Sequence, residues 1–136
     1  MTLLVTWTHA SNVGVRAMDN EHAIMMDVMN ELRSALAHGA EREQAKELLS
    51  KLIEITGTHF WNEEQLMARY SYPGLAEHST EHQRLLKQLK EFAHRQEHGE
   101  AAQLSGLLFF IHNWFIDHVE GLDKQYGPWL NKHGVS

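Results

Sequence analysis

The chain has 136 residues, of which 43% are hydrophobic and 22% are charged, and its formal net charge is −6. This length suits one domain with one core, and an acidic balance with interspersed basic residues argues against nucleic acid as a partner. The sequence has no cysteine, which excludes disulfides, thiolate zinc sites and cysteine-ligated iron–sulfur clusters. Any metal ion must therefore be held by imidazole and carboxylate groups.

The expected location follows from two further features. The longest strongly apolar run spans residues 107–111, far short of the roughly 20 residues that a membrane span needs. The first seven residues lack the basic start and the small-residue cleavage site of a signal peptide. We therefore expect a cytoplasmic protein without a membrane span.

The first predicted helix follows an N-terminal arm, residues 1–18. Asp19 or Asn20 can cap this helix, and Gly39 supplies a stop after about His38. The apolar stripe begins with a histidine and recurs at spacings of three and four residues: His22, Met25, Met29, Leu32 and Leu36. This period predicts an amphipathic helix with one buried face.

The second and third predicted helices are separated by Tyr72-Pro73-Gly74, which breaks the chain. The stripe before the break, within residues 40–70, comprises Ala45, Leu48, Leu52, Ile55, His59 and Glu63. The stripe after the break comprises Leu75, His78, His82, Leu85, Leu89 and Phe92, and it fades near residue 98. Both stripes predict helices whose buried faces include histidine.

The fourth stripe completes the fold. It comprises Leu104, Leu107, Ile111, Trp114 and His118. Four amphipathic helices with short connections predict an all-α protein, an antiparallel up-down four-helix bundle. We expect a single domain over residues 1–136, with the bundle at about 19–122 and a short C-terminal segment at 123–136.

Five histidines and a glutamate lie on these stripes, where leucine would ordinarily pack. A buried polar group destabilises a fold unless it is paired. In an antiparallel bundle, the early turns of the first and third helices meet the late turns of the second and fourth. The stripe residues that meet at that end are His22, His59, Glu63, His78, His82 and His118. Because positions i and i+4 share a helix face, the pattern indicates one buried two-metal site.

Asp123 is a seventh candidate ligand, but a regular helix does not bring it to the site. It follows His118 by five residues, which places it roughly 140° around the axis of an α-helix. It returns to the buried side only if the helix widens into a π-type turn or ends there. Gly121 makes either outcome easier.

Two other metal chemistries match parts of the pattern. The segment His78-Ser79-Thr80-Glu81-His82 fits H-x-x-E-H, in which two histidines bind zinc and the glutamate is the base of a hydrolase. That interpretation leaves the other candidates without a role. A ferritin-like di-iron site needs two Glu-x-x-His motifs, and only Glu91-Phe92-Ala93-His94 fits, away from the expected end of the bundle.

Four segments carry a resemblance to a known family. They are Met18-Asp19-Asn20-Glu21-His22, His59-Phe60-Trp61-Asn62-Glu63-Glu64, Tyr72-Pro73 followed by the segment 78–82, and Trp114-Phe115-Ile116-Asp117-His118 through Asp123. With them the chain resembles the hemerythrin family, in its bacterial single-domain form, from Trp7 to about Tyr126. All seven ligand positions expected from that family are filled.

The resemblance implies two non-haem iron ions joined by an oxo or hydroxo bridge. The implied ligands form three sets: His78, His82 and His118 on one iron, His22 and His59 on the other, and Glu63 and Asp123 as bridges. The iron with two histidines would keep an open position for reversible dioxygen binding, serving carriage, storage, delivery or sensing. We expect a binding protein and not an enzyme. A protein client for oxygen delivery, and an enzyme of the same site that acts on peroxide or nitric oxide, stay open as alternatives.

Three bulky residues near the expected ligands are candidates for the wall of an oxygen pocket. Met25 lies one turn after His22, where the family leads us to expect an aliphatic residue, and a thioether is polarizable and conformationally loose. Trp114 and Phe115 lie one turn before His118. The alternative is that all three side chains are ordinary core residues, which is the more common role of a methionine on a helical stripe. The histidines that match no ligand position are expected at the surface or around the ligands: His9, His38, His94, His98, His112 and His133.

Overall fold

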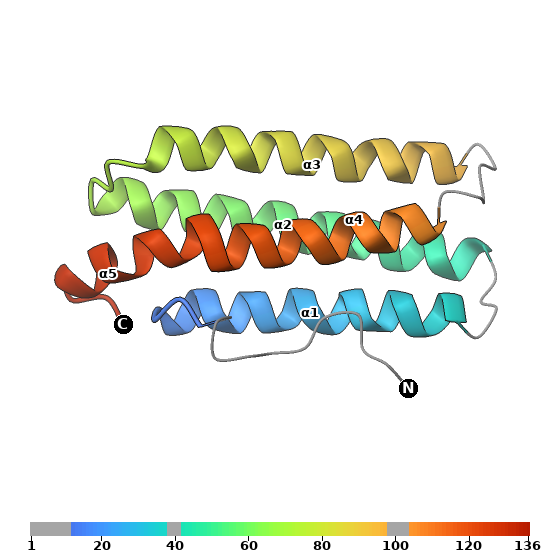
Figure 1. Cartoon of the computed structure of the whole chain (residues 1–136), viewed down its shortest axis with the longest axis horizontal. Coiled ribbons are helices and arrows are strands. Elements are labelled where there is room, and N and C mark those ends of the chain that lie inside the picture. The colour runs from blue at the N-terminus through green and yellow to red at the C-terminus, as the bar shows by residue number, and fades with distance from the viewer. Residues whose placement is uncertain (1–11, 38–41, 98–103) are drawn as a thin grey trace.

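The computed structural model describes residues 12–37, 42–97 and 104–136. Four long helices run up and down beside one another (Figure 1): α1 (Arg16–Ala37), α2 (Arg42–Arg69), α3 (Leu75–Glu97) and α4 (Leu104–Asp117). The π-helical segment η3 (His118–Asp123) continues α4, and α5 (Lys124–Lys132) follows it at one end of the bundle. The predicted all-α, antiparallel four-helix bundle is confirmed. Within the described ranges, no helix has the length and apolarity to cross a membrane.

Some predicted features lie outside the described residues. They are most of the N-terminal arm with Trp7, the helix stop at Gly39, and the histidines at 9, 38 and 98. The side chains of Leu36 and Leu104 also lie outside the described part of the chain.

Helix α1 begins at Arg16, three residues before the predicted cap at Asp19. Asp19 N–H donates to Val15 O (2.9 Å), so Asp19 already lies inside the helix. Its carboxylate accepts a hydrogen bond from Val13 N–H (2.8 Å). Asp19 therefore fixes the segment that enters α1 instead of capping the helix.

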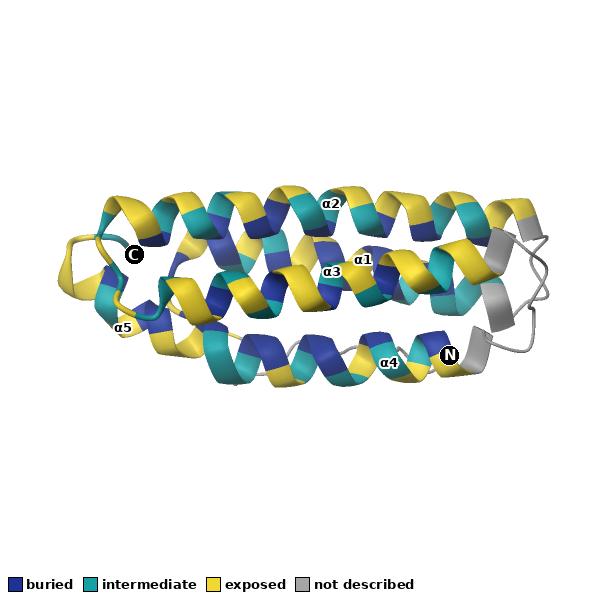
Figure 2. Cartoon of the chain, turned by 90° about the horizontal axis from the view of Figure 1, so that it is seen from above, coloured by how far each residue is buried: buried dark blue, intermediate teal, exposed yellow. Residues whose placement is uncertain are grey.

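The buried faces of the helices follow the predicted stripes, except that the stripe in α2 is shifted and that Leu75 and Phe92, at the ends of the third stripe, are only half-buried. Figure 2 shows the buried residues along the inner faces of the helices. In α2, Leu49 and Thr56 are buried, whereas the predicted Leu48 and Ile55 are only half-buried. A spacing of three and four residues fits a helical face in either order. The rotation of α2 against its neighbours decides which order is buried.

The residues after Asp123, expected as a short tail, form helix α5. Gly127-Pro128 is a turn signal in a sequence, yet α5 continues through both residues. A Cβ built on Gly127 would lie 1.9 Å from the carbonyl oxygen of Val13. Only a glycine at this position lets α5 pack directly on the backbone that leads into α1.

Two hydrogen bonds hold α5 from opposite sides. Asn131 Nδ2 donates to Gly14 O (2.9 Å), before α1, and Trp129 Nε1 donates to Tyr70 O (2.9 Å), after α2. Helix α5 therefore closes one end of the bundle.

We predict that Gly127→Ala destabilises the protein by roughly 1–3 kcal/mol, the usual cost of overpacking, because α5 must move away from Val13. Gly106→Ala in α4 is the control, since a Cβ there meets nothing within 4 Å. Alanine should stabilise that helix by up to about 1 kcal/mol. Urea unfolding measures both effects, and equal unfolding free energies for the two variants would contradict the tight packing of α5.

Candidate metal centre

All seven predicted ligands lie together at the end of the bundle that α5 closes. Every one is buried, and none is more than 5% exposed. Three helices and the π-helical segment each contribute: His22 from α1, His59 and Glu63 from α2, His78 and His82 from α3, and His118 and Asp123 from η3.

The segment η3 brings Asp123 back to the buried side. His118 is its first residue and Asp123 its last, and residues five apart align in a π-type turn. Asp123 Oδ1 lies 3.0 Å from His118 Nε2. The predicted helix distortion is confirmed. Gly121 is not needed there for space, because a Cβ built on it meets nothing within 4 Å.

Glu63 faces two different pairs of histidines. Its Oε2 atom lies 3.4 Å from His22 Nε2 and 3.0 Å from His59 Nε2. Its Oε1 atom lies 3.4 Å from His78 Nε2 and 3.1 Å from His82 Nε2. One carboxylate thus offers each of its oxygens to a separate set of imidazoles.

Asp123 divides its oxygens in the same way. Its Oδ2 atom lies 3.0 Å from His22 Nε2. Its Oδ1 atom lies 2.8 Å from His78 Nε2 and 3.0 Å from His118 Nε2. The two carboxylates therefore span the same two sets of imidazoles.

The donor atoms form two groups that share these carboxylates. We call the larger one the five-donor group, and it consists of Glu63, His78, His82, His118 and Asp123. The smaller one, the four-donor group, consists of His22, His59, Glu63 and Asp123. In each group the ligand atoms lie within 4.8 Å of one another.

Many of these atoms are buried and have no hydrogen-bond partner within the part of the chain that the structure describes. They include Nε2 of His22, His59 and His78, Oε1 of Glu63, and both carboxylate oxygens of Asp123. Leaving a buried donor or acceptor unpaired costs about 1–3 kcal/mol for each group. Imidazole nitrogens and carboxylate oxygens that face a common point without hydrogen bonds fit metal cations between them. The residues present therefore suit a two-metal site.

Neighbouring carboxylates raise the pKa of His59 and of His78. Burial lowers the pKa of His59, but Glu63 and Glu21 outweigh it, and the pKa rises to about 10. Burial is likewise outweighed at His78 by Asp123 and Glu63, and the pKa rises to about 9. In the metal-free protein at neutral pH, protons on these imidazoles therefore balance the carboxylates, and a metal cation must displace them.

In each donor group, one histidine is oriented by a carboxylate from outside the group. His59 Nδ1 lies 2.5 Å from Glu21 Oε1, and Asn62 Nδ2 donates to Glu21 Oε2 (2.8 Å). His82 Nδ1 lies 3.0 Å from Glu64 Oε2. A ring N–H held in this way directs the other ring nitrogen at the metal position and raises its basicity.

Three residues around the ligands were missed by the sequence analysis: Glu21, Glu64 and Tyr126. The first two directly adjoin a predicted ligand, so their position in the motifs was an available signal. Tyr126 lies on α5, where no helix was predicted. It is fully buried, and its hydroxyl donates to Glu63 Oε2 (2.7 Å). Burial, with Glu63 next in effect, holds the pKa of Tyr126 well above its ordinary value, so the hydroxyl keeps its proton.

The three residues named for an oxygen pocket are all buried, but they lie beside different donors. The Phe115 ring meets His22 edge-on, with centroids 6.1 Å apart, in the four-donor group. The Trp114 ring lies 6.5 Å from His118, in the five-donor group. Met25 is buried on α1, one turn after His22. Phe115 and Trp114 therefore face different metal positions.

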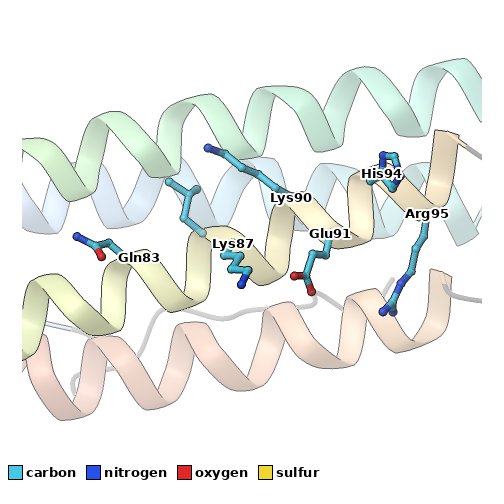
Figure 3. Close-up of a pocket in the computed structure, with 7 residues that line it drawn as sticks. Gln83, Lys87, Lys90, Glu91, His94 and Arg95 are labelled. Carbon is cyan, nitrogen blue, oxygen red and sulfur yellow. The ribbon is translucent and has the colours of Figure 1, made fainter.

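A surface hollow of about 600 Å³ on α3 is separate from this cluster (Figure 3). Its lining residues all come from α3 and include no donor: Gln83, Leu86, Lys87, Lys90, Glu91, His94 and Arg95. The Glu91-x-x-His94 match to a ferritin-like motif therefore lies on the outer surface. His112 and His133 are also exposed, so the described histidines without a ligand position lie at the surface as predicted.

Glu81, the proposed base of the zinc motif, also lies outside both donor groups. Its carboxylate pairs with the Arg84 guanidinium, with Arg84 Nε donating to Oε2 at 3.1 Å. His78 and His82 thus point into the cluster, while Glu81 between them points away.

Comparisons with known proteins agree with this geometry. Residues 13–130 match the family described as the hemerythrin HHE cation binding domain. A bacteriohemerythrin from Methylococcus capsulatus is 33% identical over 131 residues, covering 94% of this chain and 98% of the relative. A myohemerythrin from Riftia pachyptila is 25% identical and covers 88% of both chains. A crystal structure of wild-type hemerythrin aligns with a TM-score of 0.86 at 31% identity, covering 93% of this chain and 98% of that one.

A helical bundle that buries five histidines and two shared carboxylates at one end defines a cation-binding protein with paired metal positions. The match over residues 13–130 makes the assignment specific. The chain belongs to the hemerythrin family.

We predict that Asp123→Asn weakens metal retention at both positions, because Asp123 contributes an oxygen to both donor groups and a neutral amide bridges cations poorly. Glu120→Gln is the control, since Glu120 is half-buried in the same segment and is not a donor. That change should alter stability by less than about 0.5 kcal/mol. Metal analysis after dialysis tests both, and equal metal contents would remove Asp123 from the site.

We also predict that metal uptake releases protons at pH 7, because the raised pKa values of His59 and His78 keep both imidazoles protonated in the metal-free protein. Apparent metal affinity should fall as the pH is lowered, since protons compete for the same nitrogens. Calorimetric titration with zinc, a redox-inert probe, in buffers of different ionisation enthalpy counts the released protons. Uptake without proton release would contradict the assigned protonation.

Proposed function

We propose that this chain binds dioxygen reversibly at a non-haem di-iron centre, for carriage, storage, delivery or sensing. The supporting observation is the unequal donor count of the two groups, five against four, with Glu63 and Asp123 shared. A metal ion in the four-donor group would have one protein ligand fewer than its neighbour. That difference leaves room for one small external ligand on one side only.

The donor set favours iron and reversible binding. Imidazole and carboxylate ligands together suit iron. Ferritin-like oxidases use four glutamates, whereas here five imidazoles accompany two carboxylates, so the site is less anionic and less suited to oxidising a substrate. Two iron ions bound here would supply the electrons and the open coordination position that dioxygen binding requires.

The chain's own residues would assign the two ions their roles. His78, His82 and His118 would hold one ion, and His22 and His59 the other. Glu63 and Asp123 would join them.

Apolar residues would keep water from the open position. Phe115 lies against His22, and both Phe115 and Met25 are buried. Excluding water limits side reactions of a reactive site, which favours release of the ligand unchanged. Trp114 would instead pack beside the ion in the five-donor group, since its ring neighbours His118.

The surroundings of the donors favour a binding protein over an enzyme. Glu21, Glu64 and Tyr126 each bond a donor residue and so hold it in place. The zinc-hydrolase alternative requires Glu81 at the metal, yet Glu81 pairs with Arg84. Glu21, Glu64 and Tyr126 therefore act by positioning the donor residues, and this role suits a binding protein.

The test is an optical spectrum of the iron-loaded, reduced protein before air, in air and after oxygen is removed. We expect a visible band that forms in air and disappears on removal, with about two irons per chain because the donors exceed those of one tetrahedral zinc. Glu81→Gln should leave this band unchanged. A single zinc with peptidase activity lost in Glu81→Gln, or steady turnover of peroxide or nitric oxide without reversible binding, would contradict the proposal.

A further inference from the structure

Helix α5 delivers one polar group to the metal centre. Tyr126 lies next to Gly127, which packs on the Val13 carbonyl, and three residues before Trp129, which bonds Tyr70 O. With α5 held at these points, the Tyr126 side chain is fully buried and its hydroxyl reaches the carboxylate of Glu63.

The hydroxyl contacts only one of the two carboxylate oxygens. Tyr126 donates to Glu63 Oε2 (2.7 Å), whereas Oε1 has no hydrogen-bond partner among the described residues. Oε2 is the oxygen that faces His22 and His59, so it belongs to the four-donor group. The hydrogen bond therefore acts directly on the oxygen that belongs to the four-donor group.

We infer that Tyr126 is a positioning residue that makes the two metal positions chemically unequal, by drawing electron density from Glu63 Oε2. A carboxylate oxygen that accepts a hydrogen bond donates less charge to a metal ion, and groups around the ligands tune a metal in this way. The ion in the four-donor group would be poorer in electrons, which stabilises its reduced state. This inference rests on the proposed di-iron centre, and it assigns Tyr126 the task of slowing loss of the reduced form.

The direct test is Tyr126→Phe, which removes the hydroxyl and keeps the ring. Because Glu63 Oε2 regains charge, cobalt(II) titration of the metal-free variant should show tighter binding of the ion in the four-donor group, by about tenfold, a size typical of groups around metal ligands. The midpoint potential of the anaerobic iron protein should fall, by roughly 59 mV if ferric binding tightens tenfold more than ferrous binding. Oxidation of the reduced protein in air should become faster.

Two further variants separate this effect from a general loosening of α5. Trp129→Phe removes the bond to Tyr70 O and loosens α5 but keeps the Tyr126 hydroxyl, so it should shift the potential and the cobalt affinity much less than Tyr126→Phe does. Site-specific replacement of Tyr126 by a fluorinated tyrosine strengthens the donor, and it should raise the potential above that of the parent. If Tyr126 had a purely structural role, the midpoint potential would not move in opposite directions in the phenylalanine and fluorotyrosine variants.

Equal shifts in Tyr126→Phe and Trp129→Phe, or no change of potential in the phenylalanine and fluorotyrosine variants, would overturn the inference. The potential and the cobalt affinity, which decide the inference, are measured without dioxygen. If the parent protein held two irons but did not bind dioxygen reversibly, the proposed function would fail. The comparison of potentials among the parent and its variants would still decide whether Tyr126 tunes the centre.

Discussion

The structure depends on two buried carboxylates that each face two sets of imidazoles. Glu63 and Asp123 are almost fully inaccessible to solvent, and adjacent buried anions are tolerated only when cations or protons compensate them. Their oxygens divide between the five-donor and four-donor groups. The arrangement of the helices at this end of the bundle, and the π-type turn in η3, bring compensating nitrogens to both sides of both carboxylates.

A site at the end of a bundle needs additional elements to seal it. Helix α5 provides the seal, because Gly127 packs on Val13 and Trp129 bonds the backbone after α2. The same helix makes the centre asymmetric. Each donor group has one histidine backed by a carboxylate, but the Tyr126 hydroxyl reaches only the oxygen in the four-donor group. Closure of the bundle and inequality of the two positions thus come from one short helix.

Much of this site could be predicted from the sequence, because it is encoded in spacing along single helices. His59 with Glu63, and His78 with His82, are four residues apart and share a helix face. The five-residue spacing of His118 and Asp123 required a widened turn, and η3 is that turn. The antiparallel order of the helices then placed all these residues at one end. The periodic pattern was less informative in α2, where Leu49 is buried instead of Leu48.

The sequence by itself determined the four long helices and the candidate donor set, because both depend on angles around one helix axis, and the short connections between the helices determined the bundle class. Only the tertiary structure decided which oxygen of Glu63 faces which histidines, and that Phe115 and Trp114 lie beside different donors. It also decided that the residues after Asp123 form a helix and bring Tyr126 to Glu63. These features depend on how far each helix is rotated and shifted against its neighbours. Side-chain packing between helices sets those rotations and shifts, and spacing along a single helix does not contain them.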